Sequence, residues 1–208
     1  MSVAAARILA DAILANPRLS LCLAAGNTPI GTYRELAGRD FSHATLFYLD
    51  DYVGLADGHT ESFRSLLQRE FFGPCNVNPG NIHAPDARYE ETIRNCGGID
   101  LLVCGIGKNG HLAFNEPGSP FDSRTRIVDL SESTIAGRNV PRKAITMGLA
   151  TIMEARQILL LANGSEKADV LTRALKGPVA QDVPASILQH HPQLVVLTDQ
   201  ALDGNSGG

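Results

Sequence analysis

The sequence has no tryptophan, and aromatic residues make up only 5% of its 208 residues. It has no apolar run near the ~18 residues of a membrane-spanning helix and no basic-then-apolar leader, so we expect neither membrane insertion nor secretion. Basic residues do not cluster either: 18 lysines and arginines are scattered among 22 acidic residues, and the net charge is −4. Nucleic acid and anionic membranes are therefore not expected partners, whereas a small anion held by a few local groups is compatible with this composition.

The four cysteines form neither a CxxC pair nor any spacing typical of a metal site. Cys22 and Cys104 lie inside apolar, strand-like runs, so we expect both to be core residues. Thiols used in this way fit a reducing compartment. We therefore expect a cytoplasmic protein without a metal site.

Strand-like apolar runs alternate with helical patterns along most of the chain, after an opening alanine-rich helix. This alternation predicts a three-layer α/β/α fold, in which a Rossmann-like, mostly parallel sheet has helices on both faces. We expect a single domain over 1–208, with the irregular, arginine-bearing segment 119–141 forming a short lid. The strand-like runs are 19–25, 45–49, 99–105, 144–147, 158–162 and 194–198, and the helical patterns are 2–15, 29–36, 61–72, 89–95, 165–175 and 184–190.

The stretch GIGKNGHLAFNEP at 105–117 follows one of the apolar runs. Its glycines turn the chain sharply, and within the turn come an amide (Asn109), an imidazole (His111) and a carboxylate (Glu116). Ligands of open α/β sheets bind beyond the carboxyl ends of the strands, where this cluster is expected. A carboxylate near an imidazole orients it, and no third His or Cys completes a metal site. The pattern predicts a proton-handling site.

Two strand-to-helix turns are candidates for binding phosphate. The turn AAGNTP at 24–29 contains Gly26, Asn27 and Thr28, and its backbone amides and helix dipole suit an anion. Taken alone, the motif is more simply explained as an ordinary turn with a threonine cap. Lys167, in the turn GSEK, either reaches a bound phosphate or is a solvated first-turn lysine.

Asp50 and Asp51 end the second strand-like run. In an extended chain adjacent side chains point in opposite directions, so one carboxylate can face a site while the other meets a structural partner. Aspartate at a strand end is also commonly a helix cap or turn former. The residues alone leave these interpretations open.

Eight segments, in order and spanning nearly the whole chain, resemble glucosamine-6-phosphate deaminase. Galactosamine-6-phosphate deaminase/isomerase is similar over the same segments and shares GKNGH, whereas the more distant 6-phosphogluconolactonase has GxDGHxASLFP at that place. The sequence FNEP at 114–117 therefore favours the deaminases. The segments are AGNTPIGTY (25–33), FYLDDYVGL (47–55), HTESF (59–63), IDLLVCGIGKNGHLAFNEPGS (99–119), SRTR (123–126), AITMGLATIMEAR (144–156), GSEKA (164–168) and VPAS (183–186).

This resemblance implies aldose–ketose isomerisation and deamination of an amino-sugar 6-phosphate without a cofactor. Glucosamine 6-phosphate would give fructose 6-phosphate and ammonia, and the galacto epimer would give tagatose 6-phosphate. Asp50 would be the base that moves the C2 proton to C1, and His111 would open the pyranose ring, oriented by Glu116. The substrate and its phosphate would be bound by Gly26, Asn27, Thr28, Gly107, Arg138 and Lys167.

The chain departs from this family in three ways. Asn109 stands where many members carry aspartate, so Glu116 would be the only carboxylate acting on His111. Val128 stands where the longer, allosterically activated members carry a lysine, which implies a monomer or small oligomer without such activation. A strand that usually precedes the first helix is absent, so we expect an exposed sheet edge.

Two other classes compete with the deaminase interpretation. A 6-phosphogluconolactonase-type hydrolase needs no C2 base, so the Asp50 motif argues against it. A non-catalytic sugar-phosphate sensor would be expected to lose the acid/base residues and usually to carry a DNA-binding domain. The chain keeps Asp50, His111 and Glu116, which favours the enzyme.

Overall fold

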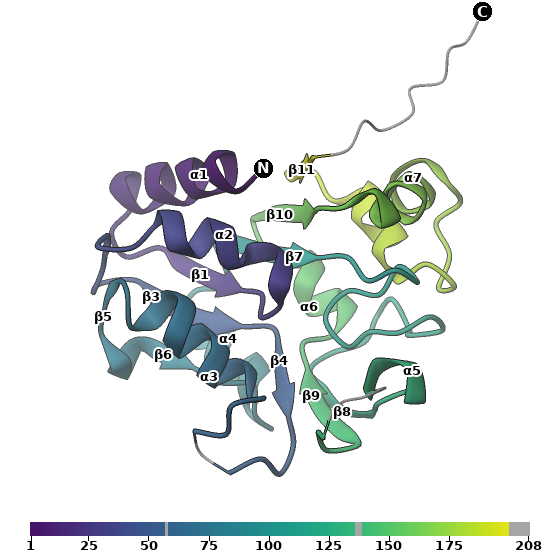
Figure 1. The fold of residues 1–208 in the computed structure, drawn as a ribbon, viewed down its shortest axis with the longest axis horizontal. Helices are drawn as coiled ribbons and strands as arrows, with labels where there is room; N and C mark the ends of the chain where they lie inside the picture. Colours follow the sequence, from purple (N-terminus) through teal and green to yellow (C-terminus); the bar gives the residue numbers. More distant parts are fainter. Residues whose placement is uncertain (57, 136–138, 200–208) are drawn as a thin grey trace, which may run out of the picture.

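The computed structural model describes residues 1–56, 58–135 and 139–199. Its core is a six-stranded sheet ordered β11-β10-β7-β1-β3-β6, in which all pairings are parallel (Figure 1). The predicted mostly parallel sheet is confirmed. Its strands are β1 Ser20–Leu23, β3 Thr45–Tyr48, β6 Ile82–His83, β7 Leu101–Gly105, β10 Gln157–Ala162 and β11 Leu194–Thr198.

Alternate side chains of the sheet enter two separate apolar cores. On β7, Val103 packs toward the helices of one face and Cys104 toward those of the other. Strands buried on both faces have near-continuous apolar sequences, which is why the runs were recognisable. Cys22 and Cys104 are fully buried, as predicted. One face is covered by α1 Ser2–Ala15, α2 Asn27–Glu35 and α3 Phe63–Leu67, and the other by α4 Tyr89–Asn95, α6 Leu149–Met153 and α7 Ala168–Lys176.

A second, antiparallel sheet lies beside the carboxyl end of β3, in the order β4-β9-β8 (Figure 1). Only Leu49 separates β3 from β4, so the chain passes directly from one sheet into the other. The run 144–147, expected in the parallel sheet, instead forms β9 of this antiparallel sheet. A short apolar run shows that a strand is buried but does not identify its partner. The strands are β4 Asp50–Tyr52, β8 Arg126–Asp129 and β9 Lys143–Thr146, and a third small sheet pairs β2 Asp40–Phe41 with β5 Asn76–Val77.

Segment 119–141 is more regular than predicted, because it contains β8 and the one-turn helix α5 Glu132–Ile135. Strand β8 pairs with β9 through four residues, so this part is anchored to the second sheet. The lid remains a prediction, and Arg138 lies outside the described residues.

Three of the predicted helices differ in type from a plain α-helix. The pattern 61–72 forms α3 followed by a π-helical turn, in which Gly73 N–H bonds to the carbonyl of Gln68 at 2.8 Å. A Cβ on Gly73 would crowd that carbonyl, so glycine permits the wide turn. The patterns 165–175 and 184–190 begin or run as 3₁₀ turns. Among the helices of the described residues, none has both the length and the apolar character needed to cross a membrane.

Candidate active site

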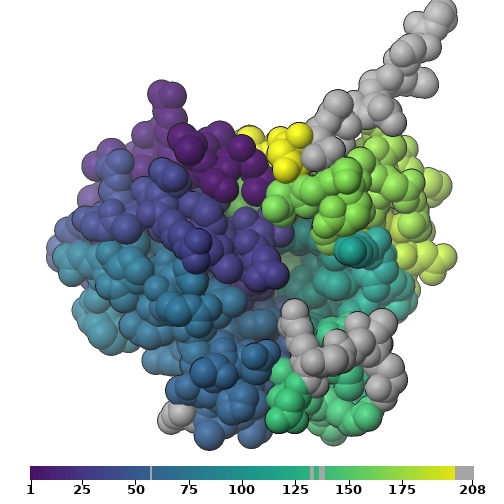
Figure 2. Space-filling view, in the orientation of Figure 1, coloured from purple at the N-terminus to yellow at the C-terminus, as the bar shows by residue number. Residues whose placement is uncertain are grey.

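A cavity of about 610 Å³ opens beyond the carboxyl ends of β1, β3 and β7, where open α/β sheets bind their ligands. In the space-filling view, residues of the first third of the chain (purple to blue) meet those of the later part (teal to yellow) across this face (Figure 2). Every described residue predicted for the site lines the cavity except Glu116, which contacts His111. The residues of that set which line it are Gly26, Asn27, Thr28, Asp50, Gly107, Asn109, His111 and Lys167.

The turn between β1 and α2 forms one end of the cavity. Gly26 has φ +155°, which L side chains rarely adopt, and a Cβ there would meet no atom within 4 Å, so the space above it is open. The buried hydroxyl of Tyr33 donates to the carbonyl of Ala24 at 2.7 Å and fixes the turn from below. The start of α2 therefore borders an open part of the cavity, and the positive end of the helix dipole there suits an anion.

Lys167 reaches the same cavity from the turn after β10. Its Nζ donates to the carbonyl of Ile106 at 2.8 Å, which holds the ammonium group over the end of β7. Partial burial lowers its pKa. Of the two interpretations left open by the sequence, the position in the cavity favours an anion-binding lysine over a solvated one.

Asp50 and Asp51 point apart, as an extended chain requires. The Asp51 carboxylate accepts hydrogen bonds from the hydroxyl of Ser62 at 2.9 Å and from the Phe63 amide at 2.9 Å, so it is the structural partner at the start of α3. Asp50 is 4% exposed and faces the cavity. Burial raises the pKa of Asp50 well above its ordinary value, and the charge of Asp51 raises it further.

An apolar wall adjoins Asp50. The rings of Phe63 and Phe114 are stacked, with centroids 5.6 Å apart and planes 12° from parallel, and both line the cavity. Tyr52 packs against both rings. This wall lowers the local dielectric, which favours the neutral form of a carboxyl group and strengthens it as a base.

His111, Glu116 and Asn109 form a connected group on the loop after β7. Nδ1 of His111 lies 3.5 Å from Oε1 of Glu116. Asn109 accepts from the His111 backbone N–H at 3.2 Å and donates from Nδ2 to Oε2 of Glu116 at 2.6 Å. The pKa of Glu116 is lowered to about 2, mainly by its contact with His111 and to a smaller extent by the hydrogen bonds from Thr134 and Asn109. The amide therefore bridges the other two groups without adding charge.

Gly107 and Ala113 shape this loop. A Cβ on Gly107 would overlap the His111 imidazole, so glycine is required where the ring packs on the backbone. Ala113 has φ +53°, at a tight turn in which the Asn115 amide bonds to the Leu112 carbonyl at 2.9 Å. A non-glycine residue in this conformation carries strain, and such strain concentrates at functional sites.

Asn115 and Arg126 support the loop from beneath. Asn115 is fully buried and donates to the carbonyls of Leu112 at 2.9 Å and Met147 at 2.8 Å. Its Oδ1 accepts from Nη1 of Arg126 at 2.8 Å. These bonds tie the loop after β7 to the second sheet and hold the His111 side of the cavity against the Asp50 side.

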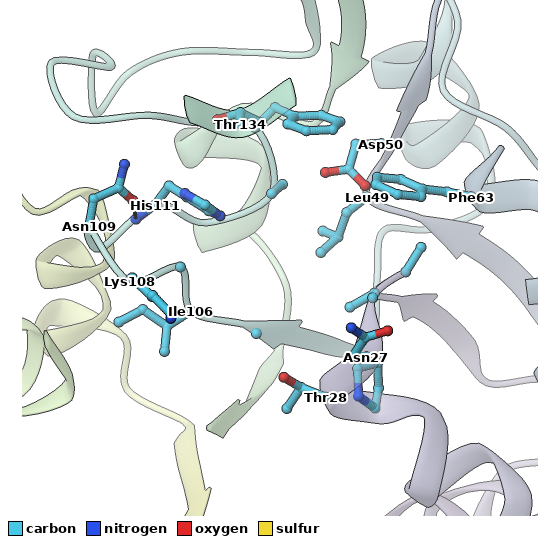
Figure 3. Close-up of a pocket in the computed structure, with 18 of the residues that line it drawn as sticks. Asn27, Thr28, Leu49, Asp50, Phe63, Ile106, Lys108, Asn109, His111 and Thr134 are labelled. Atoms are coloured by element: carbon cyan, nitrogen blue, oxygen red, sulfur yellow. Dashed lines mark hydrogen bonds between the residues drawn. The ribbon is translucent and has the colours of Figure 1, made fainter. Parts of the chain in front are cut away.

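Figure 3 shows that Asp50 and His111 face each other across one end of the cavity, while Asn27 and Thr28 lie at the other end. A carboxylate with a raised pKa and an imidazole beside a carboxylate can both move protons on one small molecule. The remote end suits a phosphate. Among the described residues, no three His, Cys, Asp or Glu side chains gather as they would around a metal ion.

The cavity lining also contains residues that were not identified as site residues from the sequence, among them Phe63, Lys108, Phe114 and Thr134. Lys108 and Phe114 lie inside the motif GIGKNGHLAFNEP (105–117), so the predicted site residues beside them could have pointed to them. Phe63 of α3 also lies in a recognised segment, HTESF (59–63), whereas Thr134 of α5 lies outside all of them. The part of Thr134 in the site depends on tertiary contacts that no local pattern encodes.

The sequence profile of the family described as glucosamine-6-phosphate isomerases/6-phosphogluconolactonase matches residues 1–196. A glucosamine-6-phosphate deaminase of Pseudarthrobacter chlorophenolicus is 43% identical, over 95% of this chain and 85% of the relative. Glucosamine-6-phosphate deaminase 2 of Bacillus subtilis is 44% identical, over 93% of this chain and 88% of that protein.

The solved structures agree with these relatives. A structure described as a monomeric glucosamine-6-phosphate deaminase superposes with a TM-score of 0.89 at 37% identity, covering 95% of this chain and 92% of the other. The 6-phosphogluconolactonase of Thermotoga maritima superposes with a TM-score of 0.74 at 22% identity, covering 93% of this chain and 94% of the other. The second likeness concerns the fold alone.

Proposed function

The chain belongs to the family of glucosamine-6-phosphate isomerases and 6-phosphogluconolactonases, and on that premise we propose that it is an amino-sugar-phosphate deaminase acting on glucosamine 6-phosphate. The reaction converts this sugar and one water into fructose 6-phosphate and ammonia. The observation that carries the proposal is that the buried Asp50 lies across one cavity from His111, which is itself paired with Glu116. Hydrolysis of a lactone needs no base at C2, so this arrangement favours the deaminase.

Ring opening is assigned to His111. The C2 proton is difficult to remove unless C1 is a free aldehyde, so the pyranose must open first. The imidazole takes the proton of the C1 hydroxyl and returns a proton to the ring oxygen as the C1–O5 bond breaks. Glu116, whose pKa of about 2 keeps it ionised, stabilises the imidazolium formed in between.

Isomerisation is assigned to Asp50. Its carboxylate removes the proton from C2 and delivers it to C1 on the same face. One proton of the substrate's ammonium group passes to the C1 oxygen, which leaves a CH2OH group at C1 and an iminium at C2. Water adds to that carbon, and ammonia leaves as the C2–N bond breaks and the ketone forms. The apolar wall of Phe63 and Phe114 keeps bulk water from the carboxylate during the transfer. Each positioned proton transfer of this kind contributes about 10²–10⁴-fold in rate.

The phosphate is assigned to the opposite end of the cavity. We assign its binding to the backbone of Gly26 and Asn27, the Thr28 side chain and the Lys167 ammonium group, all of which belong to residues that line the cavity. Gly107 contributes by leaving room for the His111 ring, and Arg138 remains a proposed ligand outside the described residues. Binding energy from this remote group positions the reacting carbons.

We further infer that the enzyme acts as a monomer or small homo-oligomer in a reducing, cytoplasmic setting. The monomeric deaminase that superposes over 95% of the chain supports the first part. The second rests on four free cysteines, of which Cys22, Cys75 and Cys104 are buried.

Purified protein should release ammonia from glucosamine 6-phosphate without added metal or nucleotide. The galacto epimer, measured in parallel, tests how the site treats the C4 hydroxyl. We expect a higher kcat/KM for the gluco epimer, because the relatives reported above are glucosamine-6-phosphate deaminases. A preference for the galacto epimer would reassign the substrate, and no ammonia from either sugar would overturn the proposed function.

A further inference from the structure

Both oxygens of the Glu116 carboxylate are held by uncharged donors. Oε2 accepts from Asn109, and Oε1 accepts from Oγ1 of Thr134 at 2.7 Å. The same Oε1 faces Nδ1 of His111. Thr134 belongs to α5, whereas the other three residues belong to the loop after β7. One of the bonds that orient Glu116 therefore comes from a separate segment of the chain, which also reaches the cavity (Figure 3).

The charge of Glu116 fixes the direction of the bond from Thr134. With its pKa held at about 2, the carboxylate is ionised near neutral pH and can only accept. The single hydroxyl proton of Thr134 therefore points to Glu116. In the hydrogen bond between Oγ of Ser131 and Oγ1 of Thr134, which are 2.8 Å apart, Ser131 is then the donor and Thr134 the acceptor. Proton donation runs from Ser131 to Thr134 to Glu116.

A neutral donor at this place has a specific consequence. A lysine or arginine would also orient the carboxylate, but it would cancel the negative charge that the imidazole experiences. A hydroxyl fixes the rotamer of Glu116 and leaves its charge for His111. Among the described residues, Glu116 is the only carboxylate within ion-pair distance of His111. Its orientation is thus the main electrostatic control on the imidazole.

We propose that Thr134 is a positioning residue, which acts through Glu116 to keep His111 competent for ring opening. The inference rests on the proposed function, because ring opening is the step assigned to His111. It gives α5 a part in catalysis without any contact between Thr134 and the reacting atoms.

The kinetic test compares Thr134→Val, which keeps the shape and removes the hydroxyl, with Thr134→Ser, which keeps the hydroxyl. For cyclic glucosamine 6-phosphate, Thr134→Val should lower kcat by about 10- to 100-fold, as expected for one hydrogen bond to a charged group. KM should stay within about three-fold, because ground-state binding is untouched. Thr134→Ser should recover most of kcat. In a Glu116→Gln background, adding Thr134→Val should lower kcat little further, since the carboxylate through which Thr134 acts is already absent.

A second readout does not depend on activity. Carbon-13 NMR titration of the Glu116 carboxyl, assigned with Glu116→Gln, should show its pKa rising from about 2 toward its ordinary value in Thr134→Val but not in Thr134→Ser. If Thr134→Val does not fold, Thr134→Ala carries the same expectation. If wild type fails to release ammonia but Thr134→Val still raises the pKa of Glu116, the proposed function is refuted, whereas the positioning of Glu116 by Thr134 is supported. The inference is overturned if kcat and the pKa of Glu116 are unchanged, if serine is as damaging as valine, or if the loss persists in full in Glu116→Gln.

Discussion

Asp50 is buried, yet its carboxylate has no hydrogen-bond or ion-pair partner among the residues that the structure describes. Burial raises its pKa because the ionised form is poorly solvated. The same burial makes Asp50 a stronger base toward a C–H proton and makes the folded protein less stable when the group is charged. Stability and activity therefore oppose each other at this position.

The variant Asp50→Asn should abolish deamination and leave substrate affinity within a few-fold of wild type. The carboxylate acts on the proton that is transferred in the transition state and contributes little to binding of the substrate in its ground state, so the loss should appear in kcat. Steady-state kinetics together with binding of a non-reactive sugar phosphate separate the two effects. A kcat near that of wild type would remove Asp50 from the mechanism.

The same variant should be more stable than wild type, and the gain should depend on pH. Below the ordinary aspartate pKa of about 3.9, Asp50 is neutral whether folded or unfolded, so the substitution changes little. As the pH rises toward the raised pKa of the folded state, ionisation favours the unfolded chain and wild type loses stability. At pH 8 a cost of about 1–3 kcal/mol corresponds to a Tm gain of roughly 2–12 °C for Asp50→Asn. A Tm difference that is the same at pH 4 and pH 8 would contradict this account.

Replacing His111 by glutamine should damage turnover of the cyclic sugar far more than that of an open-chain analogue. An open-chain substrate bypasses ring opening, which is the step assigned to the imidazole. For the cyclic sugar we expect a loss within the range of about 10²–10⁴-fold typical of one positioned proton transfer. Equal losses with both substrates would give His111 another role.

Single residues also mark the limit of prediction from sequence. The opposite directions of Asp50 and Asp51 followed from strand geometry, and the structure confirms them. The assignment of the catalytic role to Asp50 required the family resemblance. Thr134 could not be found in either way, because its bond to Glu116 spans 18 positions and depends on how α5 packs.

At the level of elements, the two glycines at the end of β7 and in the turn after it are required to different degrees. A Cβ on Gly107 would overlap the His111 ring, whereas a Cβ on Gly105 would meet only the Leu161 carbonyl at 3.8 Å. Gly107→Ala should therefore displace the imidazole and lower kcat by at least about 10-fold, with a lower Tm. Gly105→Ala is the matched control for stability and should keep a Tm near that of wild type. If the two variants have the same Tm and Gly107→Ala keeps its kcat, the packing of His111 on the turn is not required.

The second sheet shows what element-level patterns leave undetermined. The sequence predicted a strand at 144–147 but placed it in the parallel sheet, whereas β9 pairs antiparallel with β4 and β8. Strand β4 was missed because Asp50 and Asp51 interrupt the apolar pattern and aspartate is depleted in strands. This small sheet carries Asp50, so the least predictable element holds a central residue of the site.

At the scale of the whole molecule, the central sheet was predictable because its strands are buried on both faces and their sequences are continuously apolar. The position of the site followed from the same topology, since a glycine-rich loop after a parallel strand must lie at the carboxyl edge. The positions of α3 and α5 beside the site were not predictable. The pattern 61–72 predicted a helix there but not where it packs, and no helical pattern was recognised for α5.

The intact enzyme should show hyperbolic kinetics that are indifferent to N-acetylglucosamine 6-phosphate. Val128 has no charge and packs against the apolar cluster around Tyr52 and Phe114, and Arg126 is engaged with the buried Asn115. Val128 therefore offers no positive charge to an activator's phosphate, and the guanidinium group of Arg126 is already engaged within the protein. Rate curves with and without that compound, together with the mass in solution, provide the measurement. A sigmoidal curve that becomes hyperbolic on its addition would show this inference to be mistaken.

The central claim is that Asp50 and the His111–Glu116 pair act together on an amino-sugar phosphate. The most direct measurement compares, in one preparation of wild type and of Asp50→Asn, ammonia release from glucosamine 6-phosphate with hydrolysis of 6-phosphogluconolactone. We predict that wild type releases ammonia with a kcat/KM far above that for the lactone, and that Asp50→Asn loses this activity while remaining folded. Lactone hydrolysis without ammonia release, unaffected by Asp50→Asn, would contradict the account.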